Sequence, residues 1–156
     1  MKKIPLTHGQ YALVDDEDFE SLSQFKWYAC WYKQTRQFRA VRSRRVNGKG
    51  QIILMHRQIS GFPDCYVDHV NGNSLDNRRS NLRPCTAAQN QCNRTRAANN
   101  LSGFKGVDRF QDKWRAKIAL NAKTYHLGLY SSPIEAACAY DGAARVLHGR
   151  FARTNF

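Results

Sequence analysis

Short apolar runs, separated by polar turns, fill the first third of the chain. They are rich in the aromatic and β-branched side chains that favour strands, and they cover residues 10–14, 26–32, 37–43 and 51–55. Asn47-Gly48 lies between the last two runs, and this dipeptide favours a hairpin turn. Residues 18–24 can form one short helix. The pattern therefore predicts a β-rich N-terminal region.

The middle of the chain is polar and rich in turn-forming residues. Residues 61–85 are dense in Gly, Asn, Asp and Pro, which predicts a hairpin with long loops. Thr86 begins a capping-box pattern, so a helix is expected over residues 87–96. The polar stretch 94–102 is the expected linker.

The last third predicts three strands followed by one helix. The strands are expected over residues 104–109, 113–120 and 124–130. Ser132 is a good N-cap and Pro133 suits the first helical position, so the helix is expected to begin there and to end at Gly149.

The strands of this last third have two distinct faces, because side chains alternate along a strand. The face expected to pack on the helix holds Trp114, Ala116, Ile118 and Leu120. The face expected to be open to solvent holds Lys113, Arg115 and Lys117. On the final strand the inward side is expected to hold Tyr125, Leu127 and Leu129.

These patterns predict an α+β protein with two domains. Residues 1–98 are expected to hold the N-terminal β-rich region and the central hairpin with its helix. Residues 99–156 are expected to form a three-stranded antiparallel sheet packed on one helix. A chain of 156 residues has room for two small domains.

The chain is strongly basic, with 25 Lys and Arg against 12 Asp and Glu and a formal net charge of +13. Binding a polyanion releases counterions, so nucleic acid is the expected partner. No apolar run is long enough to span a membrane, no secretory signal follows the N-terminus, and no membrane partner is expected. Five cysteines without a C-x-x-C pattern predict reduced thiols in a cytosol-like compartment and no structural zinc site.

A cluster of cations marks the N-terminal region and consists of Arg36, Arg39, Arg42, Arg44, Arg45 and Lys49. Two interpretations stay open for this cluster. It is either a further contact with nucleic acid or a solvated hairpin.

Four polar residues in the middle of the chain form the most informative pattern. Asp68-His69 is followed by Asn81 after twelve residues and by Asn90 after nine more. The strands of a hairpin lie about 5 Å apart, so Asp68-His69 on one strand can face Asn81 on the return. If the first turn of the following helix packs on the hairpin, Asp68 and Asn90 oxygens can meet at one point. Two hard oxygen ligands suit Mg²⁺ or Mn²⁺ rather than zinc. His69, with an ordinary pKa of about 6.5, suits a general base, and Asn81 can hold its tautomer.

This pattern resembles the HNH endonucleases of the ββα-metal type found in homing endonucleases. The resemblance rests on the stretches 55–59, 67–78 and 81–83 together with Asn90. It implies that Asp68 and Asn90 bind the metal, that His69 activates water, and that Asn81 supports His69. The nuclease motif covers about residues 56–93. Asn90 stands where the family name has a His, and a neutral amide there disfavours zinc.

Several residues beside the motif have two possible roles. Arg57, Arg78 and Arg83 flank it and either hold phosphates or belong to the solvated surface. His56 either lies near the phosphate or caps the hairpin region.

The last third resembles the AP2/ERF DNA-binding domain. The resemblance rests on the stretches 105–107, 113–118, 126–128, 135–141, 147–150 and 155–156. It implies a sheet that lies in the major groove of DNA. By position, contact roles are expected for Lys105, Arg109, Arg115, Lys117, Lys123, Thr124 and His126.

The two resemblances together predict a metal-dependent HNH DNA endonuclease of homing type, targeted by an AP2-like sheet. Its substrate is expected to be double-stranded DNA, its cofactor Mg²⁺ or Mn²⁺, and no obligate protein partner is expected. The resemblance implies the cytoplasm of a bacterial or phage-infected cell. The alternatives are a non-catalytic DNA-binding regulator with a vestigial HNH site, and a nuclease that acts on RNA or damaged DNA.

Overall fold

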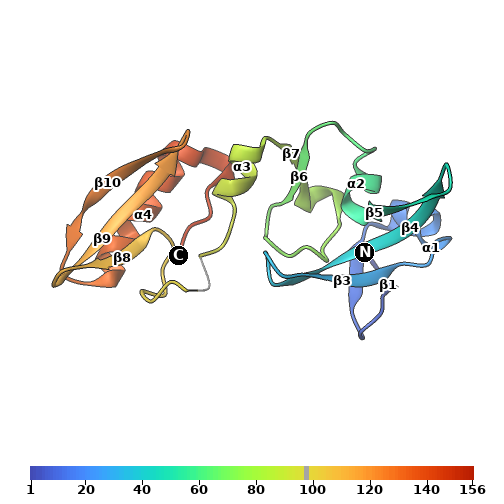
Figure 1. The fold of residues 1–156 in the computed structure, drawn as a ribbon, viewed down its shortest axis with the longest axis horizontal. Helices are drawn as coiled ribbons and strands as arrows, with labels where there is room; N and C mark the ends of the chain where they lie inside the picture. The colour runs from blue at the N-terminus through green and yellow to red at the C-terminus, as the bar shows by residue number, and fades with distance from the viewer. Residues whose placement is uncertain (97–98) are drawn as a thin grey trace. The chain divides into compact units, whose positions relative to one another are not determined.

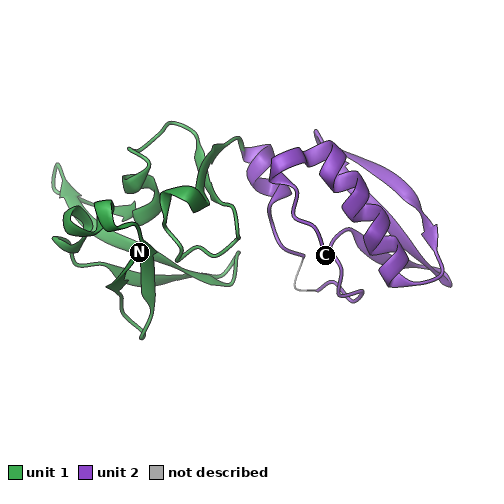
Figure 2. Cartoon of the chain, turned by 180° about the vertical axis from the view of Figure 1, so that it is seen from behind, with its two compact units in different colours: residues 1–86 green, residues 87–156 purple. Residues whose placement is uncertain are grey.

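The computed structural model describes residues 1–96 and 99–156, and it divides the chain into two compact units (Figure 2). Unit 1 covers residues 1–86 and unit 2 covers residues 87–156. We had expected the boundary between residues 98 and 99, inside the linker 94–102. Residues 97 and 98 of that linker lie outside the described residues. The predicted helix is also shorter, since α3 (Ala87–Cys92) ends before residue 96.

Unit 1 is built from small antiparallel sheets and short helices (Figure 1). Its elements are β1 (Lys2–Pro5), β2 (Tyr11–Val14), α1 (Asp16–Ser23), β3 (Tyr28–Tyr32), β4 (Gln37–Val46), β5 (Lys49–Leu54), α2 (Met55–Ile59), β6 (Tyr66–His69), a 3₁₀ turn (Arg79–Asn81) and β7 (Leu82–Cys85). The hairpin turn at Asn47 and Gly48 is confirmed between β4 and β5. The strands expected from the apolar runs are present, and β1 is an addition.

One apolar core joins the N-terminal strands and the helices α1 and α2 of unit 1. Its buried members include Val14 of β2, Ala40 of β4, Ile53 of β5 and Met55 of α2. Leu75 and Leu82, which flank the central hairpin in sequence, pack against the same core. The hairpin that carries the HNH pattern is therefore anchored on the N-terminal strands.

Unit 2 contains one sheet and one long helix. Its elements are α3, β8 (Val107–Phe110), β9 (Lys113–Leu120), β10 (Lys123–Tyr130), α4 (Pro133–His148) and a 3₁₀ turn (Gly149–Phe151). The sheet order is β10-β9-β8, and α4 covers one face of it (Figure 1). The predicted start of α4 is confirmed, because the Ser132 hydroxyl accepts a hydrogen bond from the Glu135 N–H at 3.2 Å.

The faces of β9 are arranged as expected. Ala116 and Ile118 are buried against α4, where Ala137 and Ala144 let the helix approach closely. Gly106 is required at the edge of this contact, since a Cβ there would lie 2.0 Å from the Tyr140 ring.

The inward side expected for β10 is wrong in part. A bulge between His126 and Gly128 shifts the pairing, so that Leu129 lies opposite Arg115 on the open face. Leu129 is 48% exposed, whereas Leu127 packs against the core. Tyr125 precedes the bulge and lies opposite the buried Ile118, so it is on the inward side as expected, although it is 41% exposed. A bulge inserts one residue into the alternation, which a strict period of two cannot reveal.

No helix in the described part of the chain is long and apolar enough to cross a membrane.

Candidate HNH site

The hairpin of β6 and β7 sets the first pair of site residues. Asp68 lies opposite Arg83 in the register, and the two side chains form a buried ion pair. Arg83 donates to Asp68 Oδ2 from Nη2 at 2.8 Å and from Nε at 3.1 Å. Neither role considered for Arg83, phosphate contact or solvated surface, describes this arrangement. Arg83 instead fixes the carboxylate that we expect to bind metal.

His69 follows Asp68 at the end of β6 and is oriented by an asparagine. Its Nε2 lies 3.3 Å from Asn77 Oδ1. An amide oxygen only accepts hydrogen bonds, so this contact assigns the ring proton to Nε2 and leaves the lone pair on Nδ1. Sequence reasoning missed Asn77, because the stretch 71–77 also reads as ordinary turn chemistry.

The Asn81 side chain was expected to hold the His69 imidazole. Its hydrogen bonds are instead made to the loop between β6 and β7. Its Oδ1 accepts from the Asn71 N–H at 2.9 Å, and its Nδ2 donates to the Asp76 carbonyl at 2.7 Å. These bonds join both ends of the loop that carries Asn77. Asn81 therefore acts on His69 through the loop, while Asn77 makes the direct contact.

The same loop contains a second ion pair. Arg78 donates to Asp76 from Nε at 2.8 Å and from Nη2 at 2.6 Å. These hydrogen bonds lower the pKa of Asp76, which is only 2% exposed. Arg78 was expected to contact DNA, but its guanidinium is held by the loop.

The N-terminal strands hold the loop from outside. The Leu13 N–H donates to the Leu75 carbonyl, and the Asn77 N–H donates to the Leu13 carbonyl, both at 2.8 Å. On the other side, Ser74 Oγ donates to the Phe38 carbonyl at 2.6 Å. The β-rich region before the motif is thus a scaffold that positions Asn77 and, through it, His69.

A second histidine lies against the first. The His56 ring, on α2, packs edge-on with the His69 ring at 5.0 Å between centroids and 77° between planes. Burial lowers the pKa of His56 to about 3, and it also lowers the pKa of His69 against the opposing hydrogen bond to Asn77. Both imidazoles are neutral at pH 7, so His69 can accept a proton.

Arg57 lies beside His56 but is directed to the following loop. It donates to the Cys65 carbonyl at 3.0 Å and also to the Pro63 carbonyl. These hydrogen bonds close the loop after α2, and the expected contact of Arg57 with DNA stays a prediction.

The Asp68 carboxylate is an oxygen ligand of the kind that Mg²⁺ accepts, since Mg²⁺ binds one or two carboxylates and keeps several waters. No three His, Cys, Asp or Glu side chains gather around one point in residues 1–96 and 99–156. Asn90, the other expected ligand, belongs to α3 in unit 2, and its role stays a prediction.

In unit 2, the positive charges of the two residues on β9 that are expected to contact DNA are partly neutralised. Arg115 and Lys117 both form ion pairs with Asp108 of β8, at 2.6 Å and 3.0 Å. The hydrogen bonds from these two side chains lower the pKa of Asp108 to about 2, so the carboxylate stays charged. The open face is consequently less positive than the basic residues alone suggest.

The remaining expected contacts divide into two groups. Exposed side chains are found at Arg109, Lys123, Thr124 and His126. Lys105 is different, because its Nζ donates to the Cys92 carbonyl at 2.5 Å and burial lowers its pKa to about 8. Lys105 is therefore an internal contact of unit 2, and its expected contact with DNA stays a prediction.

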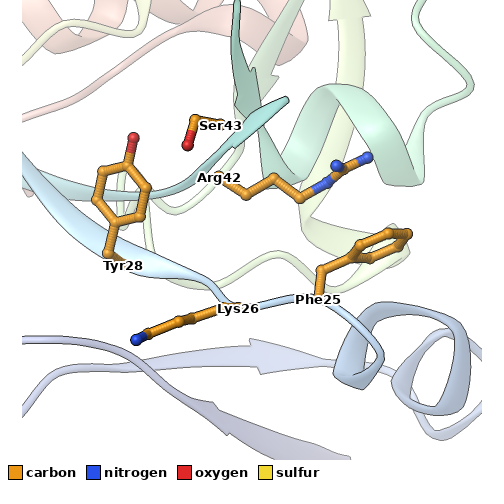
Figure 3. Close-up of a pocket in the computed structure, with 5 residues that line it drawn as sticks. All are labelled: Phe25, Lys26, Tyr28, Arg42 and Ser43. Carbon is orange, nitrogen blue, oxygen red and sulfur yellow. The ribbon is translucent and has the colours of Figure 1, made fainter. Parts of the chain in front are cut away.

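A surface pocket of about 260 Å³ lies elsewhere in unit 1 (Figure 3). It is lined by Phe25, Lys26, Tyr28, Arg42 and Ser43. The Arg42 guanidinium lies 4.0 Å from the centre of the Phe25 ring and donates from Nε to Gln58 Oε1 at 2.9 Å. None of the lining residues belongs to the HNH pattern, so this pocket is not the nuclease site.

Comparisons with known proteins agree with the geometry of the central hairpin. Residues 61–92 match the family model described as HNH endonuclease. The chain is 28% identical over 150 residues to the uncharacterized HNH endonuclease L560 of Acanthamoeba polyphaga mimivirus, covering 94% of this chain and 75% of the relative. It is 31% identical over 90 residues to Protein 3.8 of Escherichia phage T7, covering 56% of this chain and 74% of the relative. The chain therefore carries an HNH endonuclease domain.

Proposed function

We propose that this protein is a metal-dependent endonuclease that hydrolyses phosphodiester bonds in double-stranded DNA. The observation that carries the proposal is the neutral His69 imidazole, oriented by Asn77 and adjacent to the buried Asp68 carboxylate. The match of residues 61–92 to the HNH endonuclease model supports DNA as the substrate.

In the proposed reaction, His69 acts as the general base. Its Nδ1 lone pair takes a proton from a water molecule, and the water oxygen forms a bond to phosphorus as the bond to the leaving oxygen breaks. Burial keeps the imidazole neutral before the reaction, and the hydrogen bond from Nε2 to Asn77 becomes stronger when the ring acquires charge. A divalent ion such as Mg²⁺ or Mn²⁺, held by the Asp68 carboxylate, would stabilise negative charge on the phosphate.

We assign DNA targeting to the open face of the unit 2 sheet. A three-stranded antiparallel sheet backed by a helix supports the AP2-like role, and exposed cations on β8 and β10 supply phosphate contacts. A site-specific targeting module is also what the proposed homing role requires. Relatives from a virus and a phage support activity inside an infected cell.

Cleavage of supercoiled plasmid tests the proposal. Purified protein should nick the plasmid with Mg²⁺ or Mn²⁺, chelator should abolish nicking, and His69→Ala should reduce it by about 100-fold or more. His8→Ala is the matched control, since His8 is an exposed histidine of unit 1 that stacks on Phe38 rather than on the site. Undiminished cleavage by His69→Ala, or no cleavage of long mixed-sequence DNA, would contradict the proposal.

One observation favours the second candidate, a DNA-binding regulator with a vestigial HNH site. The Asp68 carboxylate already carries the Arg83 guanidinium on Oδ2, which reduces its attraction for a cation. Under this alternative the protein binds duplex DNA with strong salt dependence and does not cleave it, and His69→Ala binds as tightly as the wild type.

A further inference from the structure

The side of α4 that turns away from the sheet is exposed and partly apolar. Ala137, Tyr140 and Ala144 pack on the sheet side of the helix. Residues four positions apart share one face of a helix, and on the opposite side Ile134 is 58% exposed and Val146 is 82% exposed. We define the α4 outer face as four exposed residues at this spacing: Ile134, Cys138, Gly142 and Val146.

Gly142 occupies the middle of this face although nothing inside unit 2 requires a glycine there. A glycine within a helix is destabilising relative to alanine. A Cβ at Gly142 would meet nothing within 4 Å, so packing inside the molecule does not exclude a larger residue. With Cys138 one turn earlier, Gly142 keeps the centre of the outer face low. Small side chains at a contact allow a second helix to approach closely.

Two opposite charges flank the outer face, one near each end of α4. Glu135 accepts a hydrogen bond from the Ser131 hydroxyl at 2.9 Å, and Arg145 donates to the Phe156 carbonyl at 3.4 Å. No ion pair in residues 1–96 and 99–156 joins Glu135 or Arg145 to an opposite charge. At the rise of an α-helix they lie about 15 Å apart along the axis, so they cannot pair within one chain.

We propose that the α4 outer face binds a second copy of this chain, with the two α4 helices packed antiparallel around a twofold axis. A twofold interface brings the same surface of both copies together, so the surface has to be complementary to itself. The outer face meets this condition in both shape and charge. In the antiparallel pair, Ile134 lies opposite Val146 of the other copy, Cys138 opposite Gly142, and Glu135 beside Arg145.

The interface is expected to be weak and reversible. A single pair of helices buries less area than a standard protein–protein interface. The formal net charge of +13 also makes two copies repel each other, and salt screens this repulsion. Because α4 covers only one face of the sheet, the open face of the sheet stays accessible in both copies. The proposal does not depend on the nuclease activity of unit 1.

Sedimentation velocity of the full chain, in reducing buffer with moderate salt, tests the proposal. The wild type should shift from monomer towards dimer as its concentration rises. Glu135→Arg and Arg145→Glu, each alone, place like charges at both ends of the interface, so each should stay monomeric where the wild type dimerises. An equimolar mixture of these two variants should form a dimer again, because each copy then supplies the charge that the other lacks.

Two exposed charges of unit 1 provide the control. Glu20→Arg and Lys33→Glu should each dimerise as the wild type does. The melting temperatures of all variants show whether each is folded. A wild type that stays monomeric at its highest soluble concentration, or a mixture of folded Glu135→Arg and Arg145→Glu that stays monomeric, would overturn the proposal.

A disulfide tests the register of the two helices. Gly142→Cys places a thiol opposite Cys138 of the second copy, so mild oxidation should link two chains. Within one helix, residues four apart have Cβ atoms about 5–6 Å apart, which is too far for an undistorted disulfide. Adding Cys138→Ser should abolish the linked dimer on a non-reducing gel. A linked dimer that persists with Cys138→Ser, or none with Gly142→Cys alone, would contradict the antiparallel register.

Discussion

The arginines around the HNH hairpin and the cations of the unit 2 sheet lie in different environments. Around the hairpin, Arg57, Arg78 and Arg83 are all held by groups of the protein itself. On the unit 2 sheet, Lys123 and Arg109 remain exposed. The comparison shows that a basic residue near a nucleic-acid site is not by itself a nucleic-acid contact. Around the hairpin such residues fix geometry, and on the sheet Lys123 and Arg109 are exposed to solvent.

The largest effect that tests this comparison is expected at Arg83. Arg83→Met removes the guanidinium from the buried Asp68, and breaking a buried ion pair in this way costs about 3–5 kcal/mol in the free energy of unfolding. Amide hydrogen exchange of β6 and β7 measures the change, with the amides of β9 as an internal reference. Asp16→Asn is the control, because its pair with the N-terminal amine is exposed, and exposed pairs contribute little to stability. Similar losses for both variants would show that the Asp68 pair has no special structural role.

A pH effect of intermediate size is expected from His56. The unfolded chain binds a proton on this side chain below the ordinary pKa of 6.5, whereas the folded chain does so only below about 3. Protons therefore favour the unfolded state, and the stability of unit 1 falls as the pH decreases from 6.5 towards 3. At pH 5 the loss from this group is about 2 kcal/mol.

Urea unfolding of unit 1 at pH 7 and at pH 5 measures this loss. His56→Phe should reduce the difference between the two pH values, because the titrating group is gone. His8→Phe should leave it unchanged, since His8 is exposed. An equal pH dependence in the wild type and His56→Phe would mean that His56 is not held neutral in the folded state.

The smallest effect is expected on the affinity of unit 2 for DNA. Asp108→Asn removes the carboxylate that pairs with Arg115 and Lys117, so duplex affinity should rise several-fold and its salt dependence should become steeper. Lys123→Gln should have the opposite effect. Lys105→Met should leave the salt dependence unchanged, because Lys105 is bonded inside unit 2. Fluorescence anisotropy with a labelled duplex distinguishes the three variants, and a salt slope that falls with Lys105→Met would contradict the internal role.

Much of the fold could be predicted from local patterns. The alternation of β9 and the N-cap at Ser132 were both visible in the sequence, because each depends on neighbouring residues only. The exposure of Leu129 could not be predicted, since one bulge reverses the direction of the side chains that follow it. The internal position of Lys105 depends on Cys92, which lies in α3, before the predicted linker.

For the candidate site, the spacing of Asp68, His69 and Asn81 indicated the class of chemistry, because the HNH pattern is compact in sequence. The hydrogen-bond partner of His69 could not be predicted from the spacing. Asn77 and Asn81 lie in the same polar loop, and only the course of that loop decides which amide reaches the imidazole.

The sequence by itself determined the types of residue, the strand and helix periods, and the local motif that identifies the nuclease class. The tertiary structure decided which polar groups meet. Asp68 meets Arg83 because the two residues are opposite each other in the strand register. Leu13 forms hydrogen bonds with Leu75 and Asn77 of the HNH loop, which are far from it in the sequence. These contacts depend on long-range packing around a shared core, and packing depends on the whole chain rather than on any local stretch of it.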